Sequence, residues 1–451
     1  MNHKRLASAV VFLLYSSLCT SIAWAQADSC KKEKPNEFLL NLNYLTHGEI
    51  RAGGLPKPAS EDIIVEDRAN FLMGRMRLNL SYKRNWLEAK AVIQNSAVWG
   101  TSSNMTLNMY EAWVKATAKF GLFGQVGRIA LSYDDERIIG PNDFAMASAS
   151  HDVLRFGYEG HGHKVHAILA FNQNSSNIDI GTYYKDGAQD YKSMQVLWYH
   201  YDVPKVPLGV SLLFMNVGLQ AGEPGIKNNE PHTVYQQMYG GYVKYSPKYV
   251  TAEAAYYRQG GQTVLGSGGV DISAWMASGK VSINPSDRYG FDLGYDYLSG
   301  DDYVAVIVPG GFGMVQHKVF KGFAPLYGSR TKFYGILDYF YQSAYINGFT
   351  PGLQDANAGV HGNPWPKLNL NLRYHYLATT TKLVDYDRTL GHSIDLLASY
   401  RFTPDISLTA GYTFMMGTRT MENLKQGEGS KHAHWGWFSL VISPDLFKTR
   451  W

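Results

Sequence analysis

The sequence predicts an all-β protein, a transmembrane antiparallel β-barrel of about 18 strands, with 16 strands as the alternative. Three observations lead to this fold class. The chain begins with an export signal, and its later segments alternate polar and apolar residues. It also lacks the run of roughly 18 apolar residues that a spanning helix needs. The mean hydropathy of −0.24 suits a barrel, because only one face of each strand meets lipid.

The N-terminus predicts export from the cytoplasm. Residues 1–25 are the predicted signal peptide, in which an apolar stretch ends at the small-residue cleavage pattern Ala23-Trp24-Ala25. Residues 26–36 are polar and charged, which indicates a periplasmic N-terminal tail. Residues 37–451 are assigned to the barrel. Cys30 is the only cysteine after the signal, so no intramolecular disulfide is expected.

Alternation is clearest in residues 71–84. Arg75, Arg77 and Lys83 occupy one phase, and Met76 and Leu78 occupy the other. A slip of one residue would place these charges in lipid, so the polar phase is assigned to the lumen. From residue 191 to 220 both phases carry large apolar residues, and the pattern assigns no facing there.

Segments of strand length recur along the whole chain, and about eighteen of them are strand candidates. They span residues 38–51, 65–84, 86–99, 106–120, 121–133, 151–160, 163–173, 191–202, 207–220, 232–246, 248–260, 270–284, 287–299, 331–345, 366–379, 390–403, 405–418 and 432–443. Short turns rich in Pro, Asn and Asp join some neighbours, whereas long polar links join others. The long links are Tyr133–Ser150, Gln173–Tyr191, Ala221–Pro231, Gly300–Arg330, Tyr345–Pro364 and Gly417–Lys431. Alternating short and long connections are typical of outer-membrane barrels.

Charge and motifs exclude several function classes. The formal net charge is +4, which is too small to indicate a nucleic-acid partner. No G-x-S-x-G, H-E-x-x-H or Walker pattern occurs, so neither an enzyme nor a cofactor is expected. His161-Gly162-His163 and His432-Ala433-His434 are weak metal signals, and no metal site is assigned.

A dense charged motif follows Gly127-Arg128 and reads Tyr133-Asp134-Asp135-Glu136-Arg137-Ile138-Ile139-Gly140. Together with Phe323-Ala324-Pro325-Leu326-Tyr327-Gly328 and Gly391-His392-x-Ile394-Asp395, it resembles the motifs of the alginate export family of outer-membrane barrels, in the same order. The resemblance implies an eighteen-stranded barrel and, as in some members, export of the anionic polysaccharide alginate. The chain differs from the usual family pattern at Phe144, where tryptophan is usual, and at His392, where arginine is usual.

Asp134, Asp135 and Arg137 are interpreted as an ion network that ties a loop to the wall beside Arg128. Breaking a buried pair leaves an uncompensated charge, which gives such a network its structural value. Direct contact with solute and a calcium site remain the alternatives.

Basic residues on the polar phase predict a lumen that favours anions, because arginine binds carboxylates with two parallel hydrogen bonds. The expected pore-lining bases are Arg75, Arg77, Lys83, Lys90, Lys115, Lys119, Arg128, Arg155, Lys164, Arg373 and Arg401. The alternative is a neutral wall in which bases pair with inward acids. Those acids are Glu88, Glu111, Glu159, Asp292, Asp296 and Asp395.

The expected function is therefore passive passage of a solute through the outer membrane of a Gram-negative bacterium. The expected solute is an anionic saccharide or polysaccharide, passed between basic sites weak enough to release it. The expected partners are membrane lipid and the barrel-insertion machinery, which the terminal aromatic Trp451 would suit. A general diffusion porin is the main alternative, followed by an outer-membrane enzyme or a binding barrel.

Overall fold

The computed structural model describes residues 35–52, 68–100, 106–173, 190–222, 230–265, 268–301, 307–308, 311–312, 319–337, 339–340, 350–383, 385–425 and 432–451. The predicted signal peptide lies outside these residues.

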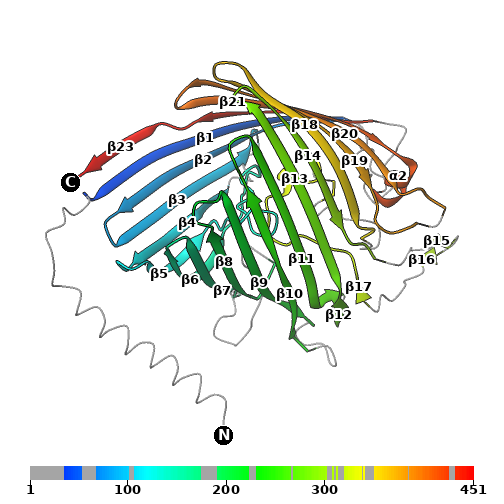
Figure 1. Ribbon diagram of the computed structural model, residues 1–451, viewed down its shortest axis with the longest axis horizontal. Helices are drawn as coiled ribbons and strands as arrows, with labels where there is room; N and C mark the ends of the chain where they lie inside the picture. The colour runs from blue at the N-terminus through cyan, green and yellow to red at the C-terminus, as the bar shows by residue number, and fades with distance from the viewer. Residues whose placement is uncertain are drawn as a thin grey trace, which may run out of the picture.

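Eighteen antiparallel strands form a closed barrel. In chain order the wall strands are β1 (Glu37–Ala52), β2 (Arg68–Lys83), β3 (Leu87–Val98), β4 (Thr106–Thr117), β5 (Leu122–Ile129), β6 (His151–Gly160), β7 (His163–Phe171), β8 (Ser193–Asp202), β9 (Leu208–Ala221), β10 (His232–Tyr245), β11 (Val250–Leu265), β13 (Ala274–Ser286), β14 (Tyr289–Leu298), β18 (Leu353–Trp365), β19 (Leu368–Ala378), β20 (Thr389–Thr403), β21 (Ile406–Gly417), β22 (Ala433–Ile442) and β23 (Asp445–Arg450). The last position is shared, because β22 and β23 both pair with β1 and close the wall. Figure 1 shows this seam, where blue β1 lies beside red β23.

The two faces of the wall follow the alternation in the sequence. Met76, Leu293 and Phe438 point outward and are exposed, as a face in contact with lipid requires. The inward Arg77 and Asp292 are buried inside the barrel. The short turns and both ends of the wall lie at one rim, which is the periplasmic rim in barrels of this kind.

The predicted fold class is confirmed, but one strand was placed wrongly. The described residues within the predicted strand 331–345 form no wall strand. β18 lies instead, except for its last residue Trp365, inside the predicted link Tyr345–Pro364. The outward positions of β18 carry small residues such as Ala356 and Ala358, so its hydropathy signal is weak. Phe333 and Tyr334 are apolar because they pack inside the lumen, and their hydropathy led to the false prediction of a wall strand.

Among the described residues, six short elements are not wall strands, and one of them is the 3-10 helix η3 (Arg330–Lys332). The other five are β12 (Gly268–Ile272), β15 (Ile307–Val308), β16 (Gly311–Phe312), β17 (Val319–Phe320) and α2 (Arg419–Lys425). The predicted strand 270–284 is divided between β12 and β13. Among the described residues, no helix has both the length and the apolar character needed to cross a membrane.

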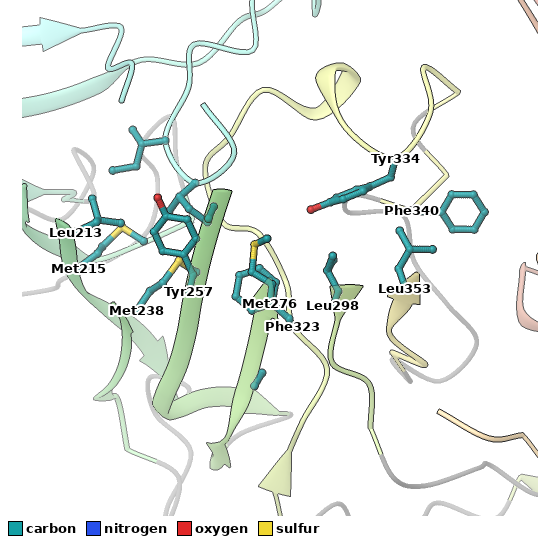
Figure 2. Packing of buried hydrophobic residues seen from close by; sticks show 14 of the residues in the cluster. Leu213, Met215, Met238, Tyr257, Met276, Leu298, Phe323, Tyr334, Phe340 and Leu353 are labelled. Atoms are coloured by element: carbon teal, nitrogen blue, oxygen red, sulfur yellow. The ribbon is translucent and has the colours of Figure 1, made fainter. Parts of the chain in front are cut away.

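An apolar core lies inside the barrel rather than between layers. Met215, Met238 and Met276 point inward from the wall and belong to one buried apolar cluster with Phe323 and Tyr334, which come from a segment in the lumen (Figure 2). This core explains the two apolar phases between residues 191 and 220. The apolar residues of one phase face lipid. Those of the other phase pack against the segment that fills part of the lumen.

Candidate solute pathway

Two segments fold into the lumen and narrow it. The first lumenal segment is residues 130–150, between β5 and β6, and the second is residues 319–337, before β18. They meet at a bridge between Ile139 and Tyr327, where the Tyr327 N–H donates to the Ile138 carbonyl at 3.0 Å.

Arg137 anchors the first lumenal segment to the wall. Its Nη1 lies 2.7 Å from Asp296 Oδ1 on β14 and donates to the Tyr334 hydroxyl at 2.9 Å. Its Nε lies 3.2 Å from Asp135 Oδ2, and its guanidinium stacks over Phe333. Burial opposes the charge, but Asp296, Tyr334 and Asp135 outweigh it and raise the pKa of Arg137 well above its usual value. The cation therefore joins both lumenal segments to β14.

Asp134 links the same segment to two further strands of the wall, β8 and β11. Its carboxylate accepts hydrogen bonds from Trp198 Nε1 on β8 at 3.1 Å and from the Tyr257 hydroxyl on β11 at 3.3 Å. Burial raises the pKa of Asp134, although hydrogen bonds from Ser211 and Trp198 act against it. Its backbone φ of 54° lies in the left-handed region, which aspartate tolerates better than most residues.

Glu136 joins the two lumenal segments to each other. Its carboxylate forms an ion pair with Lys332 and accepts a hydrogen bond from the Ser329 hydroxyl at 2.9 Å. Partial burial would raise the pKa of Glu136, but hydrogen bonds from Lys332, Ser132 and Ser329 outweigh it and lower the pKa.

The tip of the first lumenal segment docks on β2 near the barrel seam. Asp143 Oδ1 accepts from Arg77 Nη1 at 2.7 Å, and Arg75 donates to the Asp143 carbonyl at 3.0 Å. Phe144 packs edge-on against His47 and Trp437, with ring centroids 5.1 and 5.0 Å away. Arg75 and Arg77 thus hold this tip, and their side chains are buried beneath it.

The second lumenal segment rests on a buried charge network of the wall. Asp395 Oδ2 accepts a hydrogen bond from the Ile336 N–H at 3.2 Å and lies 3.5 Å from His375 Nε2. His375 Nδ1 is 2.9 Å from Asp355 Oδ1.

Most of the other predicted pore-lining bases have an acidic partner. Lys83 pairs with Glu88, Lys90 with Glu111, Lys115 with Glu159, Arg128 with Asp152, Lys164 with Asp202 and Arg373 with Asp292. Arg155 instead donates to the Tyr133 hydroxyl at 3.2 Å and to Gln125. Arg401 is exposed at the end of β20, and Lys119 lies in the turn after β4. The wall therefore contains the ion pairs of the neutral-wall alternative.

Exposure divides these pairs into two groups. On β10 and β11 the side chain of Lys244 is 50% exposed and that of its partner Glu253 is 22% exposed. The base is also the more exposed partner in Arg373–Asp292, Lys332–Glu136, Lys90–Glu111 and Lys83–Glu88. The order reverses on β4 to β8, where Glu159 is 42% exposed and Lys115 is 17% exposed, and Asp202 is more exposed than Lys164. Asp152 is likewise more exposed than Arg128, and beside β2 Asp143 is more exposed than Arg75 and Arg77. The lumen thus has a basic side and an acidic side.

Two cavities adjoin the lumenal segments. One has a volume of about 570 Å³ and is lined by Lys244, Lys280, Lys332 and Arg373 among others. The other, of about 430 Å³, is lined by Lys164, Trp198 and Asp202. Asp134, Tyr242 and Lys244 line both cavities. Their volumes match those of sites that take a small organic ligand.

Lys244, Lys280 and Lys332 were missing from the predicted pore-lining set. Lys244 and Lys280 occupy the inward phase of their strands, so the rule that identified Lys90 and Lys115 would have found them. Lys332 was overlooked because its segment was assigned to the wall. No group of three or more His, Cys, Asp or Glu suited to a metal ion occurs in the described ranges.

Comparison with solved structures places the fold among known barrels. Pseudomonas aeruginosa OccK5 (OpdH) superposes with a TM-score of 0.60 and 11% identity, over 91% of this chain and 98% of that chain. Pseudomonas aeruginosa OccK9 (OpdG) gives a TM-score of 0.60 and 13% identity, over 91% of this chain and 98% of that chain. Acinetobacter baumannii OccAB4 gives 0.58 and 10%, over 93% and 99%.

At this level of identity the likeness establishes the fold. No protein-family model matches the chain, and no curated protein matches its sequence. The closed barrel with an apolar outer face is that of a Gram-negative outer-membrane protein.

Proposed function

We propose that this protein is an outer-membrane channel for passive passage of small anionic solutes, with acidic saccharides as the solute class. The observation that carries the proposal is the unequal exposure within the ion pairs. Lys244, Lys332 and Arg373 reach the lumen, whereas their partners Glu253, Glu136 and Asp292 are more deeply buried. An entering anion would meet ammonium and guanidinium groups before carboxylates.

The mechanism is electrostatic attraction followed by weak, repeated binding. Each of these exposed bases has an acidic neighbour. The negative charge of that neighbour partly offsets the attraction of the base for an anion, so the solute is bound weakly. A channel needs such sites, because binding must favour entry and still permit release. Arg373 and Lys280 line the larger cavity together and are suited to a carboxylate.

The lumenal segments support a small solute. They join β2, β8 and β14 across the lumen through Asp143, Asp134 and Arg137. A solute must therefore pass beside a fixed constriction, and an acidic polysaccharide would pass only as an extended or short chain. The alginate-type motifs of the sequence also support an acidic saccharide as the solute.

Planar-bilayer recording under a salt gradient tests the proposal. We expect an anion-selective reversal potential, and current block by oligouronates but not by neutral oligosaccharides of equal length. Lys244→Gln with Lys280→Gln should reduce both effects. Lys205→Gln, in an exposed turn, is the matched control. Arg75 and Arg77 are unsuitable targets because they hold the first lumenal segment.

A general diffusion channel is the second candidate, favoured by the exposed Glu159 and Asp202 on the acidic side of the lumen. Open current with neither ion preference nor oligouronate block would select it and reject the anionic solute. Silence of folded barrels in the bilayer would contradict both channels.

A further inference from the structure

A groove of about 680 Å³ crosses the outer face of the wall over β10, β11, β13, β14, β18 and β19. These strands face the viewer or the upper right in Figure 1. The floor consists of small residues, which are Ala252, Ala254, Gly279, Ala356 and Ala358. The sides consist of larger residues, which are Val243, Tyr245, Leu293, Tyr295, Tyr374 and Tyr376.

Strand register brings the small residues together. Ala254 lies opposite Val243 on one side and Gly279 on the other. Ala356 lies opposite Tyr295 and Tyr376. Each small residue is therefore flanked by a larger one, and the missing side-chain volume forms a hollow in the wall.

The groove faces away from the solute pathway. Glu253 and Lys280 alternate with its floor residues and point to the lumen, where they line the larger cavity. The outward side chains of the groove carry no formal charge. Leu293 is 61% exposed, so the sides stand out from the wall into the membrane.

We propose that this groove binds one acyl chain of an anionic glycerophospholipid of the periplasmic leaflet. Within the membrane only lipid tails and apolar protein surfaces reach this face. An acyl chain seated in the groove gains the van der Waals contacts that the small floor residues leave open, and such packing drives association inside lipid. The inference depends on the outer-membrane location and is independent of which solute the channel passes.

Charge at the periplasmic rim favours an anionic headgroup. Lys248 lies in the turn between β10 and β11, and Arg288 lies in the turn between β13 and β14. Lys248 Nζ sits 4.8 Å from the Tyr249 ring centroid, a basic and aromatic arrangement typical of the headgroup region. Asp287 is the acidic residue in these turns, so the two bases leave an excess of positive charge.

Native mass spectrometry of the full-length protein tests the site, with phosphatidylglycerol or zwitterionic phosphatidylcholine added to the detergent. We expect one phosphatidylglycerol to remain bound per barrel. The double variant Ala254→Leu with Ala356→Leu fills the groove and should weaken that binding at least tenfold. Ala167→Leu, at an exposed outward position of β7, should leave it unchanged.

The headgroup is tested by a second pair of variants. Lys248→Gln with Arg288→Gln should weaken phosphatidylglycerol binding about tenfold and leave phosphatidylcholine binding unchanged, with Lys205→Gln as control. Equal retention in the filled and wild-type barrels would overturn the proposal. The proposal would also be overturned if the groove-filling variant lost an oligomer but still bound lipid. That outcome would identify a second copy of the chain as the occupant of the groove. Reversal-potential measurements on the same variants should not change, which separates this site from the proposed solute pathway.

Discussion

The guanidinium of Arg137 and the carboxylate of Asp296 form a buried ion pair, with 2.7 Å between Nη1 and Oδ1. Arg137 belongs to the first lumenal segment and Asp296 lies near the end of β14. A single contact thus fixes the constriction to the wall, and the same guanidinium bonds Tyr334 of the second lumenal segment.

Replacing Arg137 by Ala should lower the free energy of unfolding by about 3–5 kcal/mol, because Asp296 would keep a buried charge without its partner. Urea unfolding in lipid vesicles, followed by tryptophan fluorescence, measures the change. Replacing both residues by Leu should cost less than the single substitution. An Arg137→Ala protein within 1 kcal/mol of wild type (roughly the value of an exposed pair) would contradict the role given to this contact.

Replacing Asp143 by Ala should free the tip of the first lumenal segment from Arg77. The Asp143 side chain is 55% exposed, but Arg75 and Arg77 beneath it are buried and would lose their acidic partner. The stability loss should therefore exceed that of an exposed pair and reach about 1–3 kcal/mol. The larger effect should be on the channel, whose single-channel conductance should rise and fluctuate more. Asp287→Ala, in a periplasmic turn, serves as the control. An unchanged conductance would show that this anchor does not limit passage.

Acidification should release the second lumenal segment from the first. The pKa of Glu136 is lower in the folded protein than its ordinary value of 4.5. Its interactions therefore add stability at pH above 4.5, and this contribution is lost as the pH falls through the lower folded-state value. Conductance should change reversibly in that acidic range. The Glu136→Gln channel should have lost this part of the response, and persistence of the full response would assign it to other groups.

Replacing Gly127 by Ala should hinder barrel formation. Gly127 has φ of 129°, and an added Cβ would meet the Ala112 carbonyl oxygen and approach Trp113 Cα to 2.8 Å. Such backbone strain costs about 1–3 kcal/mol. The fraction of protein that keeps its folded mobility in unheated gel electrophoresis measures the effect. Gly124→Ala is the matched control on the same strand, because its nearest neighbour would be 3.8 Å away.

Alternation in the sequence was sufficient to predict most of the wall. It succeeds where large apolar residues face lipid, as on β2 and β20. It fails at β18, whose outward Ala356 and Ala358 carry little hydropathy, and at Phe333, whose apolar side chain packs inside the lumen. The strand count remained right because one missed strand replaced one false strand.

The partner of each charged residue was harder to predict than whether its side chain faces the lumen or the lipid. Lys115 lies opposite Glu88 in the register of β3 and β4, but it pairs with Glu159 on β6, and Glu88 pairs with Lys83. A long side chain inside a curved wall can reach past the adjacent strand to the next one. The local sequence pattern does not indicate which acidic residue it will pair with. The docking of Asp143 on Arg77 likewise depends on how a long link folds back into the lumen.

Closure at β1 has a consequence for assembly. The ion pair at the seam joins Glu37 and Arg450, which are 413 positions apart. The first strand must therefore keep one backbone edge unpaired until nearly the whole chain has been translocated and folded. Such an edge is a template for pairing with other chains, and long-range pairing is slow to form. The seam makes the barrel depend on protection during biogenesis, and substitutions in β23 should affect the yield of closed barrels more than the behaviour of barrels already closed.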